Sequence, residues 1–157
     1  MTADVAGSAK PFRPAAPSDV DALLVLQAAY YADDGYPFVE VEARACWRRL
    51  LDEPTHGRAW VVEHDGRLVA YAVLTFGYSL EYRGRDAFVD ELYVAPEWRG
   101  RGLAREALAV IDAACLEADV RALHLEVERD KETARGLYRR WGFVEHDRVL
   151  MTKTIGR

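Results

Sequence analysis

The segment from Asp90 to Ala104 constrains the fold more than any other part of this sequence. It reads Asp-Glu-Leu-Tyr-Val-Ala-Pro-Glu-Trp-Arg-Gly-Arg-Gly-Leu-Ala. The β-rich run 87–94 predicts a strand that ends at Pro96, and the apolar spacing after the turn predicts a helix over about 102–117. The first turn of a helix carries unpaired N–H groups and the positive end of the helix dipole. A strand that enters a helix in this way forms a potential anion-binding site.

The residues of the turn suit an anion, although an ordinary strand-to-helix turn with solvated arginines is the alternative. Gly100 and Gly102 carry no side chain, so the backbone has room to close around a phosphate. Arg99 and Arg101 add positive charge and forked hydrogen-bond donors. Other phosphate motifs fit less well, because no P-loop pattern is present and Arg105 stands where the dinucleotide fingerprint requires its last glycine.

The rest of the chain alternates helical and β-rich segments. Ser18 and Asp21 have the spacing of a capping box at the start of a helix that fades near Tyr31. Asp65-Gly66 is a two-residue hairpin turn. We further predict an extended segment over 12–15, helices over about 40–51 and 133–141, and strands over 59–63, 68–76, 122–128, 143–145 and 148–154. Residues 77–85 form either a long loop or frayed strand ends. This order predicts an α+β fold with helices on the faces of a mixed sheet.

Composition excludes several classes of function. The 157 residues are enough for one domain, with residues 1–10 as a loose tail and 11–157 as the folded part. Lys plus Arg is 21 and Asp plus Glu is 26, and the net charge of −5 argues against nucleic-acid binding and binding to anionic membranes. No secretory signal, membrane span or metal-type Cys/His spacing is apparent. Cys46 and Cys115 form no disulfide framework, so we expect a cytoplasmic protein with reduced thiols.

Two separate motifs carry a resemblance to a known family. Arg99-x-x-Gly102-x-Ala104 is similar to the Arg/Gln-x-x-Gly-x-Gly/Ala signature of the GCN5-related N-acetyltransferases (GNAT). Ala134-x-x-Leu137-Tyr138-x-x-x-Gly142-Phe143 resembles the family's second motif. The element order over 12–154 also matches, so the resemblance covers nearly the whole chain. One departure is Lys131, which stands where the family has an asparagine that helps to position the cofactor or substrate.

The resemblance implies the GNAT fold, with a mostly antiparallel sheet, and acetyl-CoA as co-substrate without a metal. It places the pyrophosphate in the Gly/Arg turn and the pantetheine arm along the strand from Leu92 to Val94. Lys131 could meet a cofactor phosphate in place of the missing asparagine contact. The implied cofactor-binding residues are Leu92, Tyr93, Val94, Arg99, Gly100, Arg101, Gly102, Leu103, Ala104 and Lys131.

Acetyl transfer to an amine needs a base, because an alkylammonium with a pKa of about 10 is not nucleophilic at neutral pH. Asp90 and Glu91 are the candidates, with a slight preference for Glu91. Adjacent strand residues point to opposite faces, so without a bulge only one carboxylate can face the acceptor. The resemblance makes Tyr138 the candidate acid for the leaving thiolate. The alternative readings are exposed carboxylates in ion pairs and a tyrosine that only packs.

The segment between the first two helices supplies most of the candidates for acceptor binding. In this family the segment between the first two helices often helps to form the acceptor pocket, and here residues 30–38 combine aromatic rings with carboxylates. This mixture suits a cation such as a polyamine, an amino sugar or a lysine side chain. A solvated turn with packing aromatics is the alternative. The acceptor candidates are Tyr31, Asp34, Tyr36 and Tyr82.

The sequence therefore predicts an N-acetyltransferase that moves an acetyl group from acetyl-CoA to a primary amine of a small molecule or peptide by direct attack. One alternative is a GNAT-fold module that binds acyl-CoA without turnover. Another is an enzyme that uses a longer acyl-CoA. Homodimers are common among proteins of this fold, although no interface can be read from these residues.

Overall fold

A computed structural model describes residues 11–156, so the predicted tail over 1–10 lies outside the described residues. The chain divides into two compact units, Met1–Leu125 and Glu126–Arg157. The first unit contains the sheet, and its strands are β1 (Arg13–Pro14), β2 (Gly57–His64), β3 (Arg67–Ser79), β4 (Gly84–Val94) and β5 (Ala122–Leu125). Its helices are the short η1 (Pro17–Asp19) and η2 (Pro96–Trp98), with α1 (Val20–Asp34), α2 (Glu40–Asp52) and α3 (Leu103–Glu117).

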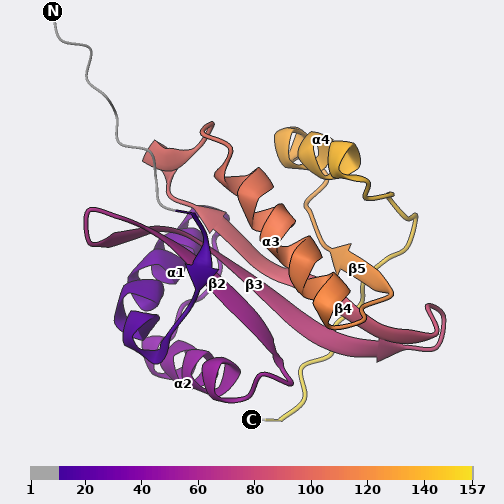
Figure 1. Ribbon diagram of the computed structural model, residues 1–157, viewed down its shortest axis with the longest axis horizontal. Helices are drawn as coiled ribbons and strands as arrows, with labels where there is room; N and C mark the ends of the chain where they lie inside the picture. Colours follow the sequence, from indigo (N-terminus) through magenta and orange to yellow (C-terminus); the bar gives the residue numbers. More distant parts are fainter. Residues whose placement is uncertain (1–10, 157) are drawn as a thin grey trace, which may run out of the picture. The chain divides into compact units, whose positions relative to one another are not determined.

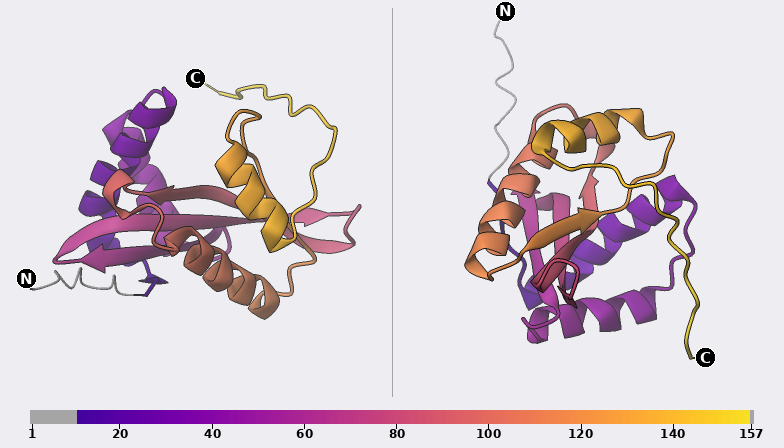
Figure 2. Two further views of the ribbon diagram at one scale, coloured as in Figure 1. Left: turned by 90° about the horizontal axis from the view of Figure 1, so that it is seen from above. Right: turned by 90° about the vertical axis from the view of Figure 1, so that its right-hand side faces the viewer.

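The sheet has the order β1-β2-β3-β4-β5. All neighbouring strands are antiparallel except β4 and β5, which are parallel. Helices α1 and α2 cover one face and α3 covers the other, which the left view of Figure 2 shows edge-on and Figure 1 shows face-on. The predicted α+β class, with a mixed and mostly antiparallel sheet and helices on both faces, is confirmed.

Alternating residues of the central strands build two separate cores. On β3, Ala70 and Ala72 belong to the core under α3, whereas Tyr71 and Val73 belong to the core under α1 and α2. The same division separates Trp60 and Val62 from Ala59 and Val61 on β2. Both faces of these strands are therefore buried, which accounts for the nearly unbroken apolar runs in the sequence.

Residues 77–85 were predicted as a long loop or frayed strand ends, and both alternatives were wrong, because this segment consists of the paired ends of β3 and β4 with a short turn between them. β3 continues to Ser79, β4 starts at Gly84, and the two stay paired to the end of the hairpin. At the other end of the chain, the strand predicted over 122–128 is shorter, because β5 stops at Leu125. The capping prediction was also wrong: η1 precedes α1, and Asp19 rather than Ser18 accepts the Ala16 N–H at 2.7 Å.

The second unit contains α4 (Glu132–Trp141). The strands predicted over 143–145 and 148–154 are absent from it, so that prediction was wrong. A β-rich run becomes a strand only when a neighbouring backbone pairs with its N–H and C=O groups. No described strand pairs with residues 143–156, and Val149, Leu150 and Met151 are exposed.

Candidate active site

A β-bulge on β4 determines where the two candidate acids lie. Val73 pairs with Glu91 and the next residue of β3, Leu74, pairs with Val89, so Asp90 is an extra residue on β4. Before the bulge, Ala87 and Val89 face the α3 core, and after it Leu92 and Val94 do. The extra residue therefore reverses the alternation of the strand. This reversal brings consecutive carboxylates toward the same face, the one covered by α1 and α2.

Both acids line one cavity of about 200 Å³. Its other walls come from α1, α2 and β3. The complete lining is Gln27, Cys46, Trp47, Leu50, Val73, Thr75, Asp90 and Glu91. The sequence argument required a bulge before both carboxylates could face the acceptor, and the structure contains that bulge.

Glu91 is held by three neutral donors, two from α1 and one from β3. The Tyr31 hydroxyl donates to Oε1 at 2.7 Å, and the Tyr71 hydroxyl donates to Oε2 at 2.7 Å. The Gln27 Nε2 amide lies 3.1 Å from both oxygens. Hydrogen bonds of this kind to a charged acceptor are stronger than neutral ones, and together they fix the orientation of the carboxylate.

A second layer of contacts fixes Gln27 itself. Gln27 is buried, and its Oε1 accepts a hydrogen bond from the Trp47 indole Nε1–H at 2.8 Å. This bond orients the amide so that its NH₂ group faces Glu91. The Trp47 ring packs edge-on against Tyr71 with centroids 5.6 Å apart. Sequence reasoning missed Gln27 and Tyr71, because positions 27, 71 and 91 share no local motif.

The environments of Asp90 and Glu91 differ. Burial, followed by the hydrogen bond to Glu91 and its charge, raises the pKa of Tyr31 above its ordinary value. Burial and the Glu91 charge likewise raise the pKa of Tyr71, so both phenols stay protonated as donors. Asp90 makes no hydrogen bond or ion pair with any described residue, and burial of its carboxyl raises its pKa, although the residue is partly exposed.

The predicted acceptor residues divide into two groups. The Tyr31 ring makes edge contacts with Tyr36 at 5.8 Å and with Phe38 at 5.9 Å. The aromatic segment therefore adjoins the cage of donors around Glu91, which consists of Gln27, Tyr31 and Tyr71. Asp34 is the last residue of α1. Tyr82 lies at the tip of the β3–β4 hairpin, where its ring packs against His124 at 5.1 Å. The structure therefore brings Tyr31 and Tyr36 together and gives Tyr82 a different set of neighbours.

The Gly/Arg turn has the backbone shape that an anion site needs. Gly100 and Gly102 have φ values of +72° and +87°, and a Cβ at either position would meet nothing within 4 Å. Gly102 is the N-cap of α3, and its carbonyl accepts the N–H groups of Arg105 and Glu106. In residues 11–156, none of the N–H groups from Gly100 to Ala104 donates to a backbone carbonyl. Leu103 is buried beneath this turn.

The two arginines of the turn contact the protein itself. Arg99 Nε donates to the Val94 carbonyl at 3.0 Å, and its guanidinium lies 3.4 Å from the Asp33 carboxylate. Arg101 lies over the Trp98 ring at 4.5 Å and donates to the Glu97 carbonyl at 3.2 Å. Both residues remain exposed. These contacts hold their charges beside the turn.

Strand β4 has one open edge between the bulge and the turn. β5 pairs with β4 only from Asp86 to Val89, whereas β3 pairs with it as far as Val94. Residues 90–94 therefore have a strand partner on one side only among the described strands. The Tyr93 side chain is buried in the core under α1 and α2, and its hydroxyl donates to Asp33 at 3.0 Å.

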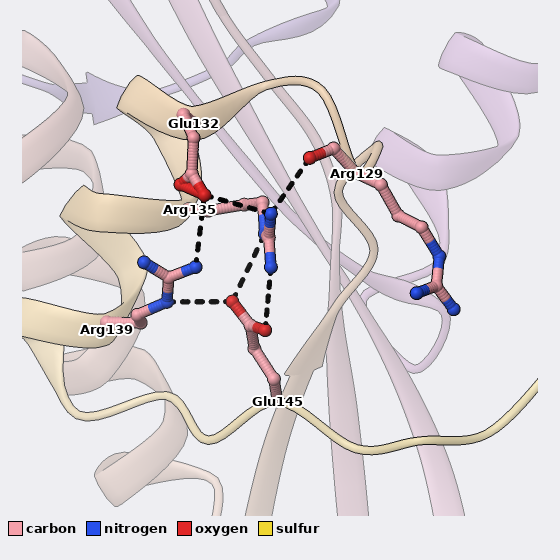
Figure 3. Close-up of polar contacts among 5 residues, drawn as sticks. All are labelled: Arg129, Glu132, Arg135, Arg139 and Glu145. Carbon is pink, nitrogen blue, oxygen red and sulfur yellow. Dashed lines mark hydrogen bonds and ion pairs between the residues drawn. The ribbon is translucent and has the colours of Figure 1, made fainter.

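The second unit holds the remaining candidates, Lys131 and Tyr138. Lys131 is the exposed N-cap of α4. The Tyr138 ring packs edge-on against Phe143 at 5.8 Å, and burial raises the pKa of its hydroxyl. Figure 3 shows a charged cluster on the same helix, in which Arg135 and Arg139 both contact the Glu145 carboxylate at 2.8 Å. This cluster ties the segment after α4 to the helix.

The described residues contain no group of three or more His, Cys, Asp and Glu side chains arranged for a metal ion. None of the helices within 11–156 is both long enough and apolar enough to cross a membrane.

Comparison with known proteins points to the same family as the two sequence motifs. The family model described as "Acetyltransferase (GNAT) family" matches residues 22–143. The chain belongs to the GNAT family. The match includes the cavity, the bulge and the Gly/Arg turn, and it confirms the resemblance drawn from the two motifs.

Individual relatives agree with this assignment. The chain is 37% identical over 75 residues to the uncharacterized N-acetyltransferase YycN of Bacillus subtilis, a match over 48% of this chain and about half of YycN (47%). An integron cassette protein from the Cole Harbour salt marsh metagenome superposes with a TM-score of 0.83 at 34% identity, over 94% of this chain and 91% of that one. A predicted acetyltransferase of Clostridium acetobutylicum, solved with acetyl-CoA, superposes with a TM-score of 0.78 at 21% identity, over 90% of this chain and 94% of that one. The GNAT fold is therefore confirmed.

Proposed function

We propose that this GNAT protein is an N-acetyltransferase that moves an acetyl group from acetyl-CoA to a primary amine. The observation that carries this proposal is the combination of an edge of β4, at 90–94, that no second described strand covers with a turn from Gly100 to Ala104 whose N–H groups donate to no described backbone carbonyl. The open edge begins at the cavity that Asp90 and Glu91 line. The Clostridium neighbour solved with acetyl-CoA supports the choice of co-substrate.

The turn suits the diphosphate of the co-substrate. The left-handed glycines Gly100 and Gly102 leave open space above unpaired N–H groups, and the positive end of the α3 dipole adds to their attraction for an anion. Arg99 and Arg101 are held close by. The edge at Leu92–Val94 offers N–H and C=O groups to an extended amide-containing arm. Lys131 remains a proposed phosphate contact.

Asp90 is the better candidate base in this geometry. Glu91 already accepts hydrogen bonds from Tyr31, Tyr71 and Gln27, whereas Asp90 has no partner and a raised pKa. A carboxylate with a raised pKa and no competing donor accepts a proton more readily. We therefore propose that Asp90, directly or through a water molecule, takes the proton of the ammonium. The sequence alone slightly favoured Glu91. It could not show the donors that occupy Glu91, because they come from distant positions in the chain.

The nitrogen loses two protons in the transfer. The ammonium gives the first to Asp90, which passes it to water, and the free amine then forms a bond to the acetyl carbon while the bond from that carbon to the thioester sulfur breaks. The leaving thiolate takes a proton from a donor, and the second proton of the nitrogen, lost as the amide forms, restores that donor. Tyr138 is our proposed donor, because a protonated phenol is a suitable acid for a thiolate. Residues 11–157 would then serve as one acetyltransferase domain in the cytoplasm.

The test combines binding and turnover. Calorimetric titration with CoA measures affinity, and thiol release in the presence of an amine panel measures transfer. Gly102→Glu places a negative charge at the turn and should weaken CoA binding by about tenfold or more. Gly66→Glu is the matched control, because Gly66 has a similar φ of +76° and open space but lies in the β2–β3 turn. Equal CoA affinity in both folded variants would contradict the proposal.

Turnover separates this proposal from its two alternatives. Tight CoA binding with no acetylated product would favour an acyl-CoA-binding module. Faster turnover with propionyl-CoA or succinyl-CoA than with acetyl-CoA would favour a longer acyl donor. Product from an amine and acetyl-CoA, identified by mass spectrometry, would support the proposed function.

A further inference from the structure

The cavity beside the bulge carries a negative charge that no residue of its wall neutralises. Its lining includes Asp90 and Glu91 but no lysine, arginine or histidine. The hydrogen bonds of Glu91 come only from the neutral groups of Gln27, Tyr31 and Tyr71. A partly buried carboxylate usually has a cation as its partner, since desolvation of an unpaired charge is costly. Here no cation among the described residues contacts the Glu91 carboxylate.

The cage around Glu91 indicates that its charge is held in one place. Gln27 is buried and is itself oriented by the Trp47 indole, and Tyr71 is fully buried. Neutral donors fix the carboxylate without cancelling its charge, in contrast to Asp19 or Asp33, whose carboxylates lie beside arginines. The arrangement resembles a preformed receptor for a positive group.

The size and walls of the cavity restrict what that positive group is attached to. The cavity is small, at about 200 Å³. Trp47, Leu50 and Val73 contribute apolar surface to the wall. A short aliphatic chain fits these walls, whereas a sugar ring bearing several hydroxyl groups would lose hydrogen bonds to water there.

We propose that the acceptor of this protein is a primary alkylammonium at the end of a short, unbranched aliphatic chain, and that Glu91 is the fixed anion that recognises its charge. A carboxylate on the amine-bearing carbon is excluded, because it would lie near Asp90 and Glu91. This inference rests on the proposed acetyltransferase function. Gln27, Tyr31, Tyr71 and Trp47 act as positioning residues, since they determine where the Glu91 charge lies.

Three amines that share the pentylamine skeleton test the proposal. Norleucine is pentylamine with a carboxylate on the amine-bearing carbon, and 2-amino-1-hexanol is norleucine with that carboxylate reduced to a neutral alcohol. With acetyl-CoA and the full chain, kcat/KM should be about tenfold or more higher for pentylamine than for norleucine. The amino alcohol should exceed norleucine several-fold, because it has the same branching without the charge.

Glu91→Gln keeps the shape of the side chain and removes its charge. It should reduce the preference of pentylamine over norleucine by about tenfold, mainly through a higher KM for pentylamine, while the dissociation constant of CoA stays within about twofold. Tyr31→Phe removes one donor of the cage and should change the preference in the same direction by a smaller factor. This second variant keeps the test open if Glu91→Gln folds poorly.

The possible outcomes distinguish this inference from the proposed function. Acetylation of norleucine as efficient as that of pentylamine would overturn the inference and leave the acetyltransferase in place. A preference for pentylamine over norleucine that is unchanged in folded Glu91→Gln would also overturn the inference. The same holds if the protein acetylates a different class of amine and does not acetylate pentylamine. Absence of both CoA binding and acetyl transfer with every amine would overturn the proposed function, and the inference with it.

Discussion

The hydroxyl of Tyr71 donates a hydrogen bond of 2.7 Å to Oε2 of Glu91 across the β3–β4 pair. Tyr71 is in register with Tyr93, and Glu91 with Val73, so the bond runs diagonally between positions on the same face. Because Tyr71 is fully buried, its hydroxyl has no access to bulk water. The bond therefore satisfies the tyrosine and orients the carboxylate at the same time.

Removal of this hydroxyl should weaken the folded state. We expect Tyr71→Phe to lower the free energy of unfolding by about 1–2 kcal/mol, because a hydrogen bond to a charged group is lost while Glu91 stays partly buried. Urea denaturation of the variant and the wild type measures the difference. Tyr78→Phe, on an exposed position of the same strand, is the control and should leave stability unchanged. Equal midpoints for all three proteins would show that the bond contributes nothing.

Gln27→Glu should make stability depend on pH in a defined direction. The new carboxyl would lie about 3 Å from Glu91, and two carboxylates at that separation do not ionise together. The pKa of the introduced group is then raised in the folded state. Stability is kept at pH values below its ordinary pKa of about 4.3 and is lost as the pH rises through the raised value.

Urea denaturation at pH 4.5 and pH 8 checks this prediction. Gln27→Met is the neutral control of similar length, and its stability relative to the wild type should vary little between the two pH values. A Gln27→Glu variant with the same loss of stability at both pH values would argue against close contact between positions 27 and 91.

Asp90→Asn should separate stability from activity. Burial raises the pKa of Asp90, so the folded state favours the protonated carboxyl; this contribution is present below the ordinary pKa of about 3.9 and lost as the pH rises. An amide resembles the protonated form. The variant should therefore unfold at a slightly higher urea concentration than the wild type at pH 7.5, and the gain should vanish near pH 4.

The same variant should lose most of its activity. If Asp90 takes the proton, kcat should fall by about 100-fold or more at pH 7.5, with unchanged affinity for CoA in calorimetry. Retention of wild-type turnover by a folded Asp90→Asn protein would remove Asp90 from the mechanism and direct attention back to Glu91.

Glu145→Gln should release the segment that follows α4. Arg135 and Arg139 contact this carboxylate (Figure 3), and their hydrogen bonds lower its pKa. The contact therefore persists at neutral pH and is lost as the pH falls through the lowered value. Limited digestion with trypsin should cleave the variant faster after Arg148 and Lys153. Asp147→Asn removes a nearby charge without these contacts and should digest like the wild type.

Salt gives an independent check on this cluster. The groups are exposed, so their attraction is screened at high ionic strength. Digestion of the wild type should approach that of Glu145→Gln as salt increases. Rates that do not differ at low salt would show that the ion pairs do not hold the segment.

Local sequence patterns were enough to predict the strand, the turn and the helix over 87–117. Pro96, the glycines at 100 and 102 and the apolar spacing of the helix act over a few residues, so each can be read without knowledge of the rest of the chain. The family assignment followed from the same short stretch and from the motif that ends at Phe143. Strands over 143–154 were predicted on equally local grounds and failed, because a strand also requires a partner that local composition does not specify.

The chain order alone determined that Asp90 and Glu91 are adjacent and lie on a strand. Only the tertiary structure decided that they face the same cavity, since the bulge depends on the register between β3 and β4. It also decided their different environments. The donors to Glu91 lie 20, 60 and 64 positions away along the chain, and contacts over such separations arise from packing of helices on a sheet rather than from any periodicity in the sequence.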